Sequence, residues 1–178
     1  MRIIVLCGLP GVGKLTVAKG LARLRGYRVF HNHLVFDAVE ALFPFGSEAF
    51  TELRERLWLE LLSRAVRERV GDIIFTIAGD KALRADFLVT LVSALSRMDV
   101  RVWCIELTCS IAMLEQRLIS ADRSRFGKLN SVERYRQLIS VGAFPRLVMP
   151  PETITIDTSA LSAEEAAMAI DAEVNRAQ

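Results

Sequence analysis

A nine-residue segment near the amino terminus combines residue types that suit the binding of phosphate. It reads Gly-Leu-Pro-Gly-Val-Gly-Lys-Leu-Thr over residues 8–16, and Gly8, Gly13 and Lys14 fit the spacing G-x-x-x-x-G-K. Glycines let backbone amides approach an oxyanion, and a following helix adds partial positive charge at its N-terminus. Lys14 would supply a point charge for the β- and γ-phosphates of ATP. The predicted phosphate-binding residues are Gly8, Pro10, Gly11, Val12, Gly13, Lys14, Leu15 and Thr16.

The context of this segment favours a phosphate loop over a plain glycine-rich turn. An apolar β-branched run at 2–7 precedes it, and helical apolar spacing begins at Lys14. One position departs from the motif, since Leu15 stands where Ser or Thr normally binds Mg²⁺. Thr16 is rotated by about 100° on the helix and cannot replace that hydroxyl. Either Mg²⁺ is held by phosphates, waters and a carboxylate such as Asp80 or Asp37, or catalysis is weakened.

The order of apolar runs predicts how the chain positions this loop. Strands are expected at 2–7, 27–30, 72–78, 100–107 and 153–156, and helices at 14–24, 34–42, 47–70, 81–97, 111–119, 131–141 and from 162 onward. Repeated strand–helix units predict an α/β fold of three layers, a parallel sheet with helices on both faces. We expect one domain over residues 1–178, because no linker or repeat divides the chain.

Two of these helices carry specific expectations. The helix at 47–70 should bury one apolar face, with its Arg and Glu residues in solvent. That apolar face comprises Phe50, Leu53, Leu57, Trp58, Leu61, Leu62, Ala65 and Val66. Asp80 is placed to cap the helix at 81–97, and Ser162 with Glu165 should form a capping box on the last helix.

The segment GLPGVGKLTVAK, the five-strand layout and the ending IDTSALSAEEAA together resemble the shikimate kinase and gluconate kinase group of P-loop proteins, which is related to the nucleoside-monophosphate kinases. The resemblance covers nearly the whole chain in layout. It implies a P-loop NTPase fold with strand order 2-3-1-4-5, ATP as cosubstrate and Mg²⁺ as cofactor. It also implies an acceptor-binding insert at about 31–70 and an arginine-bearing lid at about 120–130.

The expected acceptor pocket lies after the second and third strands. His31, Asn32 and His33 follow the second strand, where open α/β sheets bind ligands, and either contact the acceptor or form a structural loop or cap. Their HNH spelling does not indicate a nuclease, because such a site needs a different fold. Asp37 is a general base for the acceptor hydroxyl or an exposed helix carboxylate.

Basic residues supply the remaining candidates. Lys81 and Arg84 match the basic pair that follows the third strand in gluconate kinases, or belong to a solvated helix face. Arg123 and Arg125 lie in the predicted lid, where positive charge over the γ-phosphate favours phosphoryl transfer. Arg117 precedes the lid and is a candidate for nucleotide binding.

Composition excludes several classes of function. Lys and Arg total 23 against 21 Asp and Glu, so the net charge of +2 gives no reason to expect a nucleic-acid surface or a membrane anchor. The three cysteines, Cys7, Cys104 and Cys109, lack zinc-ligand spacing and suit reduced thiols in a cytoplasmic protein. A catalytic thiol at Cys109 is a minority interpretation. We expect a monomer or homodimer acting on a small-molecule acceptor.

The sequence therefore predicts an enzyme that transfers the γ-phosphoryl group of ATP to a hydroxyl of a small polar metabolite. A nucleotide kinase or an antibiotic kinase is the nearest alternative. A nucleotide-binding module with little turnover also remains open, because Leu15 breaks the metal-binding part of the motif.

Overall fold

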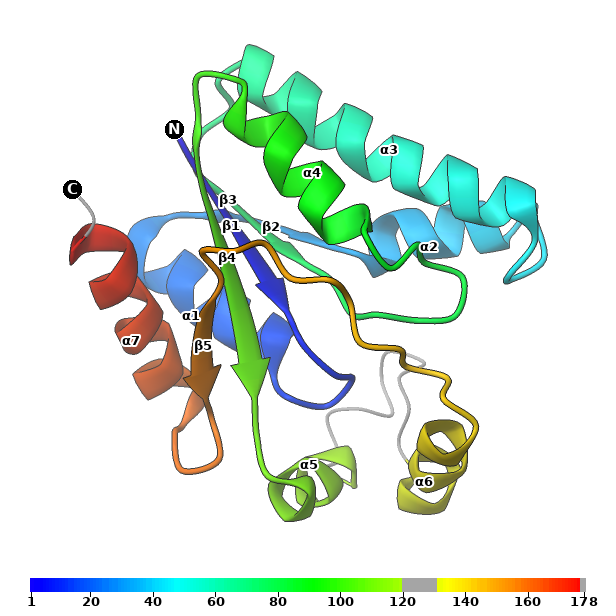
Figure 1. The fold of residues 1–178 in the computed structure, drawn as a ribbon. Coiled ribbons are helices and arrows are strands. Elements are labelled where there is room, and N and C mark those ends of the chain that lie inside the picture. Colours follow the sequence, from blue (N-terminus) through cyan, green and yellow to red (C-terminus); the bar gives the residue numbers. More distant parts are fainter. Residues whose placement is uncertain (120–130, 177–178) are drawn as a thin grey trace.

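The computed structural model describes residues 1–119 and 131–176, and within them the chain forms a parallel five-stranded sheet (Figure 1). The strand order is β2-β3-β1-β4-β5. The strands are β1 (Arg2–Cys7), β2 (Arg28–His31), β3 (Ile73–Thr76), β4 (Arg101–Thr108) and β5 (Ile154–Asp157). The predicted fold class and strand order are confirmed. The predicted lid at 120–130, with Arg123 and Arg125, lies outside the described residues.

Helices cover both faces of the sheet. They are α1 (Lys14–Arg25), α2 (His33–Glu40), α3 (Glu48–Arg67), α4 (Phe87–Ser96), α5 (Ile111–Leu118), α6 (Val132–Ser140) and α7 (Ala163–Arg176). Figure 1 shows α1 and α7 beside each other, with α3 and α4 on the other side of the strands. It also shows α5 and α6 beyond the ends toward which β1, β4 and β5 point.

Successive side chains of β1 point to opposite faces of the sheet, and this explains the two apolar cores. Ile3 and Val5 pack into a core with side chains of α2, α3 and α4, whereas Ile4 and Leu6 pack into a second core with side chains of α1 and α7. All four side chains are fully buried. A central parallel strand is covered on both faces, so its sequence reads as one continuous apolar run.

Ser162 caps the last helix as the sequence predicts. Ser162 Oγ accepts a hydrogen bond from Glu165 N at 3.2 Å, while Glu165 Oε2 accepts one from Ser162 N at 2.8 Å. This reciprocal pair is the expected capping box at the start of α7. The predicted cap at Asp80 is wrong, because α4 begins only at Phe87. Residues 81–86 instead form turns that bury Ala82 and Leu83.

The predicted solvent face of α3 is partly wrong. Arg54 is 0% exposed and Glu55 is 1% exposed, although both were expected in water. Leu61, expected in the core, is 48% exposed. The physical reason is tertiary: both charged side chains find opposite charges on the segment between β3 and α4. A buried charge is tolerated when it is paired and hydrogen-bonded in this way.

Within the described residues, no helix combines the length and the apolar character needed to cross a bilayer.

Candidate active site

A cavity of about 720 Å³ opens at the carboxyl ends of β1, β2 and β3. Two groups of residues line it. The phosphate loop and the segment around Thr158 form what we call the nucleotide end. Residues that follow β2 and β3, together with Leu138 and Phe144, form the acceptor end. Parallel α/β sheets bind ligands at this edge, so the location agrees with the general rule.

The phosphate loop has a backbone that only glycine adopts readily. Gly8 has φ 135° and Gly13 has φ 103°. A Cβ on Gly8 would also collide with the carbonyl oxygen of Leu107 in β4. The loop leads directly into α1, whose first-turn N–H groups have no partner within the helix. The loop therefore has the conformation and the donors that a phosphate group requires.

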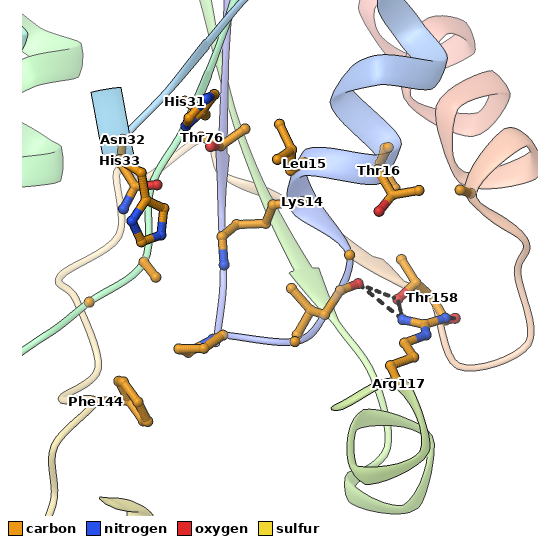
Figure 2. Close-up of a pocket in the computed structure, with 18 of the residues that line it drawn as sticks. Lys14, Leu15, Thr16, His31, Asn32, His33, Thr76, Arg117, Phe144 and Thr158 are labelled. Atoms are coloured by element: carbon orange, nitrogen blue, oxygen red, sulfur yellow. Dashed lines mark hydrogen bonds between the residues drawn. The ribbon is translucent and has the colours of Figure 1, made fainter. Parts of the chain in front are cut away.

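Lys14 closes over this loop. Its Nζ donates hydrogen bonds to the carbonyl oxygens of Gly8 at 2.7 Å and Leu9 at 2.9 Å. Figure 2 shows the ammonium group in the space that His33 also borders. A lysine held at the mouth of the loop can exchange these carbonyls for phosphate oxygens without a change of backbone.

Arg117 joins the phosphate loop to the end of β5. Its Nη1 donates to the Val12 carbonyl at 3.0 Å and to Thr158 Oγ1 at 2.9 Å, and its Nη2 donates to the Thr158 carbonyl at 2.6 Å (Figure 2). Thr158 Oγ1 in turn donates to the carbonyl of Thr108 at 2.9 Å. Arg117 thus lines the cavity while its guanidinium orders the loop, and its role in nucleotide binding stays a prediction.

Leu15 and Thr16 both line the cavity, Leu15 partly buried and Thr16 exposed. Leu15 belongs to neither apolar core, so its side chain is not needed for packing there. Among the described residues, no group of three or more His, Cys, Asp or Glu side chains is arranged to hold a metal ion. A metal at this site would depend on phosphate oxygens and waters for most of its ligands.

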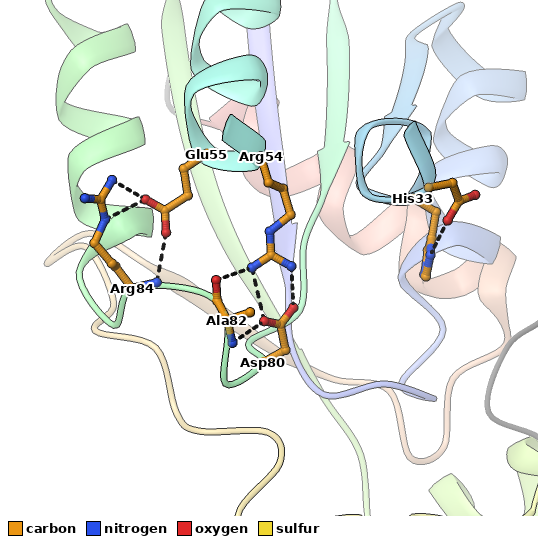
Figure 3. Close-up of polar contacts among 7 residues, drawn as sticks. His33, Arg54, Glu55, Asp80, Ala82 and Arg84 are labelled. Carbon is orange, nitrogen blue, oxygen red and sulfur yellow. Dashed lines mark hydrogen bonds and ion pairs between the residues drawn. The ribbon is translucent and has the colours of Figure 1, made fainter. Parts of the chain in front are cut away.

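The acceptor end begins with His31, Asn32 and His33, all of which line the cavity. Asn32 occupies the N-cap position of α2 but makes no side-chain capping hydrogen bond. Its amide group is therefore not used to begin the helix. Asp37, the predicted general base, is 72% exposed and is not among the residues that line the cavity. It lies 3.7 Å from Nδ1 of His33 (Figure 3).

Asp80 lines the cavity, and hydrogen bonds hold both oxygens of its carboxylate. Its two oxygens accept hydrogen bonds from Arg54 Nη1 at 2.8 Å and Nη2 at 3.1 Å, and Oδ1 also accepts from Ala82 N at 2.8 Å (Figure 3). Arg54 Nη2 donates further to the Ala82 carbonyl at 2.7 Å. Rings of Phe50 and Trp58 lie 4.8 and 5.0 Å from the guanidinium carbon. The buried guanidinium therefore fixes the carboxylate and balances its charge.

The predicted basic pair after β3 does not reach this cavity. Arg84 binds Glu55 of α3 through its side chain and its backbone N–H, and its side chain is 61% exposed. Lys81 is exposed as well. Neither residue is among those that line the cavity. Because Glu55 occupies its guanidinium, Arg84 acts as a tether between α3 and the segment that precedes α4.

Sequence reasoning missed an aromatic surface at the acceptor end. His33, Phe36 and Phe45 form what we call the aromatic wall, with ring centroids 5.6 Å apart for His33–Phe36 and 6.0 Å apart for Phe36–Phe45. All three line the cavity. The signal was the phenylalanine-rich stretch between β2 and α3, which periodicity alone assigns to the core.

Phe144 and Leu138 border the cavity from the segment that follows the predicted lid. A Cβ on Gly79 would lie 2.5 Å from the Pro145 carbonyl oxygen, so this segment passes directly against the end of β3. Phe144 also stacks on Tyr135 of α6, with ring centroids 6.1 Å apart. Thr76 and Thr158 are two polar lining residues that sequence reasoning did not select.

The cysteines are free thiols. Cys7 and Cys104 are buried, and Cys109 is partly buried at the end of β4. Burial raises the pKa of Cys109 despite the nearby Arg117. A raised pKa lowers the thiolate fraction, which argues against a nucleophilic role for this thiol.

Comparison with solved structures identifies the same fold in several kinases. The tunicamycin resistance protein of Deinococcus radiodurans is 26% identical with a TM-score of 0.64, over 97% of this chain and 95% of that one. APS kinase of Mycobacterium tuberculosis, in complex with AMPPNP and APS, is 14% identical with a TM-score of 0.68, over 98% and 97% of the two chains. Shikimate kinase of Acinetobacter baumannii, in complex with shikimate, is 20% identical with a TM-score of 0.59, over 100% and 95%.

No protein-family model and no curated protein sequence matches the chain. The structural neighbours are P-loop kinases, and this chain has their fold over nearly its full length. The predicted resemblance to this group of kinases is thereby confirmed at the level of the fold, while the acceptor is not defined by it.

Proposed function

We propose that this protein is an ATP-dependent phosphotransferase that moves the γ-phosphoryl group to a hydroxyl of a small metabolite. One observation carries the proposal: Lys14, held over a glycine loop with positive φ values, shares a single cavity with His31, Asn32 and His33. A phosphate-binding loop and a set of polar acceptor groups are thus open to the same small volume.

The residues present fit the phosphates of a nucleotide. The loop amides and the α1 N-terminus would hold the β- and γ-phosphates, Lys14 would neutralise them, and Thr16 would reach the α-phosphate. Bound ATP supplies the phosphoryl group and the leaving ADP. Arg117 keeps the loop in place through Val12 and Thr158. Arg123 and Arg125 keep their proposed role as lid residues that add positive charge over the transferred group.

The residues fit Mg²⁺ only as an ion bound mainly through phosphate and water. Leu15 offers no ligand, and Asp80 accepts three hydrogen bonds within the protein. A carboxylate has about four acceptor positions, so Asp80 retains room for one water. We propose that Asp80 contacts the ion through such a water, and that Asp37 does not, because it is absent from the cavity lining.

In the transfer step, the acceptor oxygen bonds to the γ-phosphorus while the bond to the β–γ bridging oxygen breaks. ADP leaves with that electron pair, and the hydroxyl proton must go to a base. We propose His33 Nε2 as this base, because His33 lines the cavity while its Nδ1 faces Asp37 at 3.7 Å. Asp37 would then stabilise the protonated ring instead of contacting the acceptor.

The test is ADP release with and without a pool of small hydroxyl compounds. A kinase shows release that the pool stimulates, whereas a nucleotide-binding module binds ATP and releases almost no ADP in either case. Binding without stimulation by any acceptor would overturn the proposal.

An antibiotic kinase is the second candidate. It rests on the 26% identity to the Deinococcus tunicamycin resistance protein over nearly both chains. Expression of this protein in a sensitive bacterium, followed by growth on a panel of hydroxyl-bearing antibiotics, tests it. Unchanged sensitivity to the whole panel would count against this candidate and leave the metabolite kinase standing.

A further inference from the structure

The charges that surround the acceptor end are already paired within the protein. Asp80 is the one carboxylate among its described lining residues, and Arg54 binds both of its oxygens. Arg54 is fully buried and also binds the Ala82 carbonyl. The nearby Arg84 is bound to Glu55 and lies outside the cavity lining. No guanidinium of the described residues is therefore offered to an acidic acceptor at this end.

The same geometry penalises an acceptor that carries a carboxylate. Such a group would share this end with Asp80, whose charge already takes up the Arg54 guanidinium, so it would find no guanidinium partner among the described lining residues of this end. Loss of its hydration would also go uncompensated, because a charge moved out of water needs a paired and hydrogen-bonded partner. Lys14 lies at the phosphate loop, where the nucleotide would engage it. Shikimate-like and gluconate-like acids are thus a poor match for this end of the cavity.

What the acceptor end does offer is flat apolar surface. Phe45 is 49% exposed although it lines the cavity, and it lies 6.0 Å from Phe36 and 5.4 Å from Phe50, measured between ring centroids. Phe50 backs both rings from within the core. Phe144 adds a further ring to the lining from the segment that passes over Gly79. Aromatic rings favour offset or edge-on contact with another ring at such spacings.

Resting on the kinase function proposed above, we propose that the acceptor is an uncharged alcohol that carries a flat aromatic or heteroaromatic ring. The ring lies against the aromatic wall of His33, Phe36 and Phe45. His31 and Asn32 provide hydrogen-bonding groups for its polar edge, and the hydroxyl is directed toward Lys14 and the phosphate loop. This class includes nucleosides and aryl-substituted diols, which share the ring and the neutral hydroxyl.

Pairs of ligands that differ by one carboxylate separate the effect of charge on binding from the effect of ring shape. Uridine and orotidine differ by one carboxylate on the same ring, and phenylglycol and mandelate differ by a carboxylate in place of a hydroxymethyl group. Thermal shift with Mg²⁺ and ADP present, at about pH 8 where histidine is ordinarily neutral, measures binding without turnover. At least one neutral probe should raise the melting temperature, and its acidic counterpart should bind at least tenfold more weakly. Uridine and phenylglycol also separate nucleosides from aryl alcohols.

Variants of the wall test the contact itself. Phe45→Ala should weaken binding of the effective neutral probe about tenfold and leave ADP binding unchanged. Leu42→Ala is the matched control, because Leu42 is exposed in the same connection and does not line the cavity. Phe45→Arg should bring acidic probes to at least equal affinity, since it adds the missing guanidinium at an exposed position.

The possible outcomes are distinct. Stronger binding of the acidic members, no binding of either neutral probe, or no effect of Phe45→Ala would each overturn the inference. Binding of a neutral probe, with no compound of the pool stimulating ADP release, would support the ligand class at this end and contradict the proposed kinase function. Binding with stimulated release would support both.

Discussion

The two ends of the cavity are built in different ways. The nucleotide end is built around one continuous segment, the phosphate loop at 8–16, whose polar groups are mostly backbone amides held by glycines and a helix start. Arg117 joins this loop to the segment around Thr158. The acceptor end is assembled from α2 and the connection that follows it, from the end of β3 and the residues after it, and from the segment around Phe144. Its polar and aromatic groups are side chains, and the ion pair with Arg54 of α3 holds one of them, Asp80, in place.

This difference explains how one fold serves different acceptors. Backbone amides present the same donors whatever the neighbouring side chains are, so a phosphate loop persists through large changes elsewhere. The acceptor end depends on residues far apart in sequence, and a change in any of them alters its shape or charge. Low identity to proteins of the same fold, 14–26% here, therefore leaves the acceptor undefined.

The largest effect is expected from a substitution that disables the nucleotide end. Lys14→Ala should lower phosphoryl transfer by about 10²- to 10³-fold, as the loss of one group that stabilises transition-state charge does. The melting temperature should stay unchanged, because Lys14 contacts loop carbonyls and not a core. Lys19→Ala is the control, since Lys19 is exposed on the same helix and does not line the cavity. Normal transfer by Lys14→Ala would remove the basis of the kinase assignment.

The next largest effect is expected from removal of the ion pair that supports the acceptor end. Arg54→Met should lower the free energy of unfolding by about 3 kcal/mol, because it leaves Asp80 without its buried partner. Urea denaturation measures this change. Arg64→Met on the same helix removes an exposed pair with Glu68 and should cost little. Equal stability of the two variants would show that Arg54 does not hold the acceptor end together.

A third test sharpens the assignment of roles within the acceptor end. His33→Gln should lower kcat about 10²-fold, as expected for loss of a general base, with little change in ATP affinity. Asp37→Asn should lower kcat by less than about fivefold, because exposed ion pairs contribute roughly 1 kcal/mol or less. The reverse ranking of the two variants would return the role of base to Asp37.

The smallest effect concerns the metal at the boundary of the two ends. Leu15→Ser restores the usual hydroxyl and should lower the Mg²⁺ concentration for half-maximal activity several-fold. Thr16→Val is the control, since that hydroxyl is assigned to the α-phosphate and should change ATP affinity instead. Identical Mg²⁺ titrations for the parent and Leu15→Ser would show that position 15 does not govern the metal. Full parental activity in excess chelator would exclude a metal requirement.

Local patterns in the sequence were enough to predict much of the fold. The β-branched run at 2–7, the glycine spacing around Lys14 and the Ser162–Glu165 cap each depend on neighbours within a few residues. Such features are decided by backbone conformation and periodicity, which the local sequence contains. The strand order followed from the resemblance to known kinases, and the structure agrees with it.

Long-range partners account for the errors. Arg54 and Glu55 look like solvent-facing residues of an amphipathic helix, because nothing near them in sequence predicts Asp80 and Arg84 as their ion-pair partners. Asp80 looks like a helix cap for the same reason, although its oxygens face a guanidinium from α3. Phe45 is a residue type usually found in the core, yet its side chain remains half exposed at the cavity. These outcomes depend on tertiary geometry that periodicity does not record.

In the proposed function, the two ends of one cavity work together to transfer a phosphoryl group. Phosphorus NMR of the protein with ATP, Mg²⁺ and the pooled ring-bearing alcohols follows donor and product in one sample. We expect the signal of a phosphate monoester to grow in step with that of ADP and to be absent with Lys14→Ala. Formation of ADP with inorganic phosphate alone, or no consumption of ATP, would contradict the proposed function.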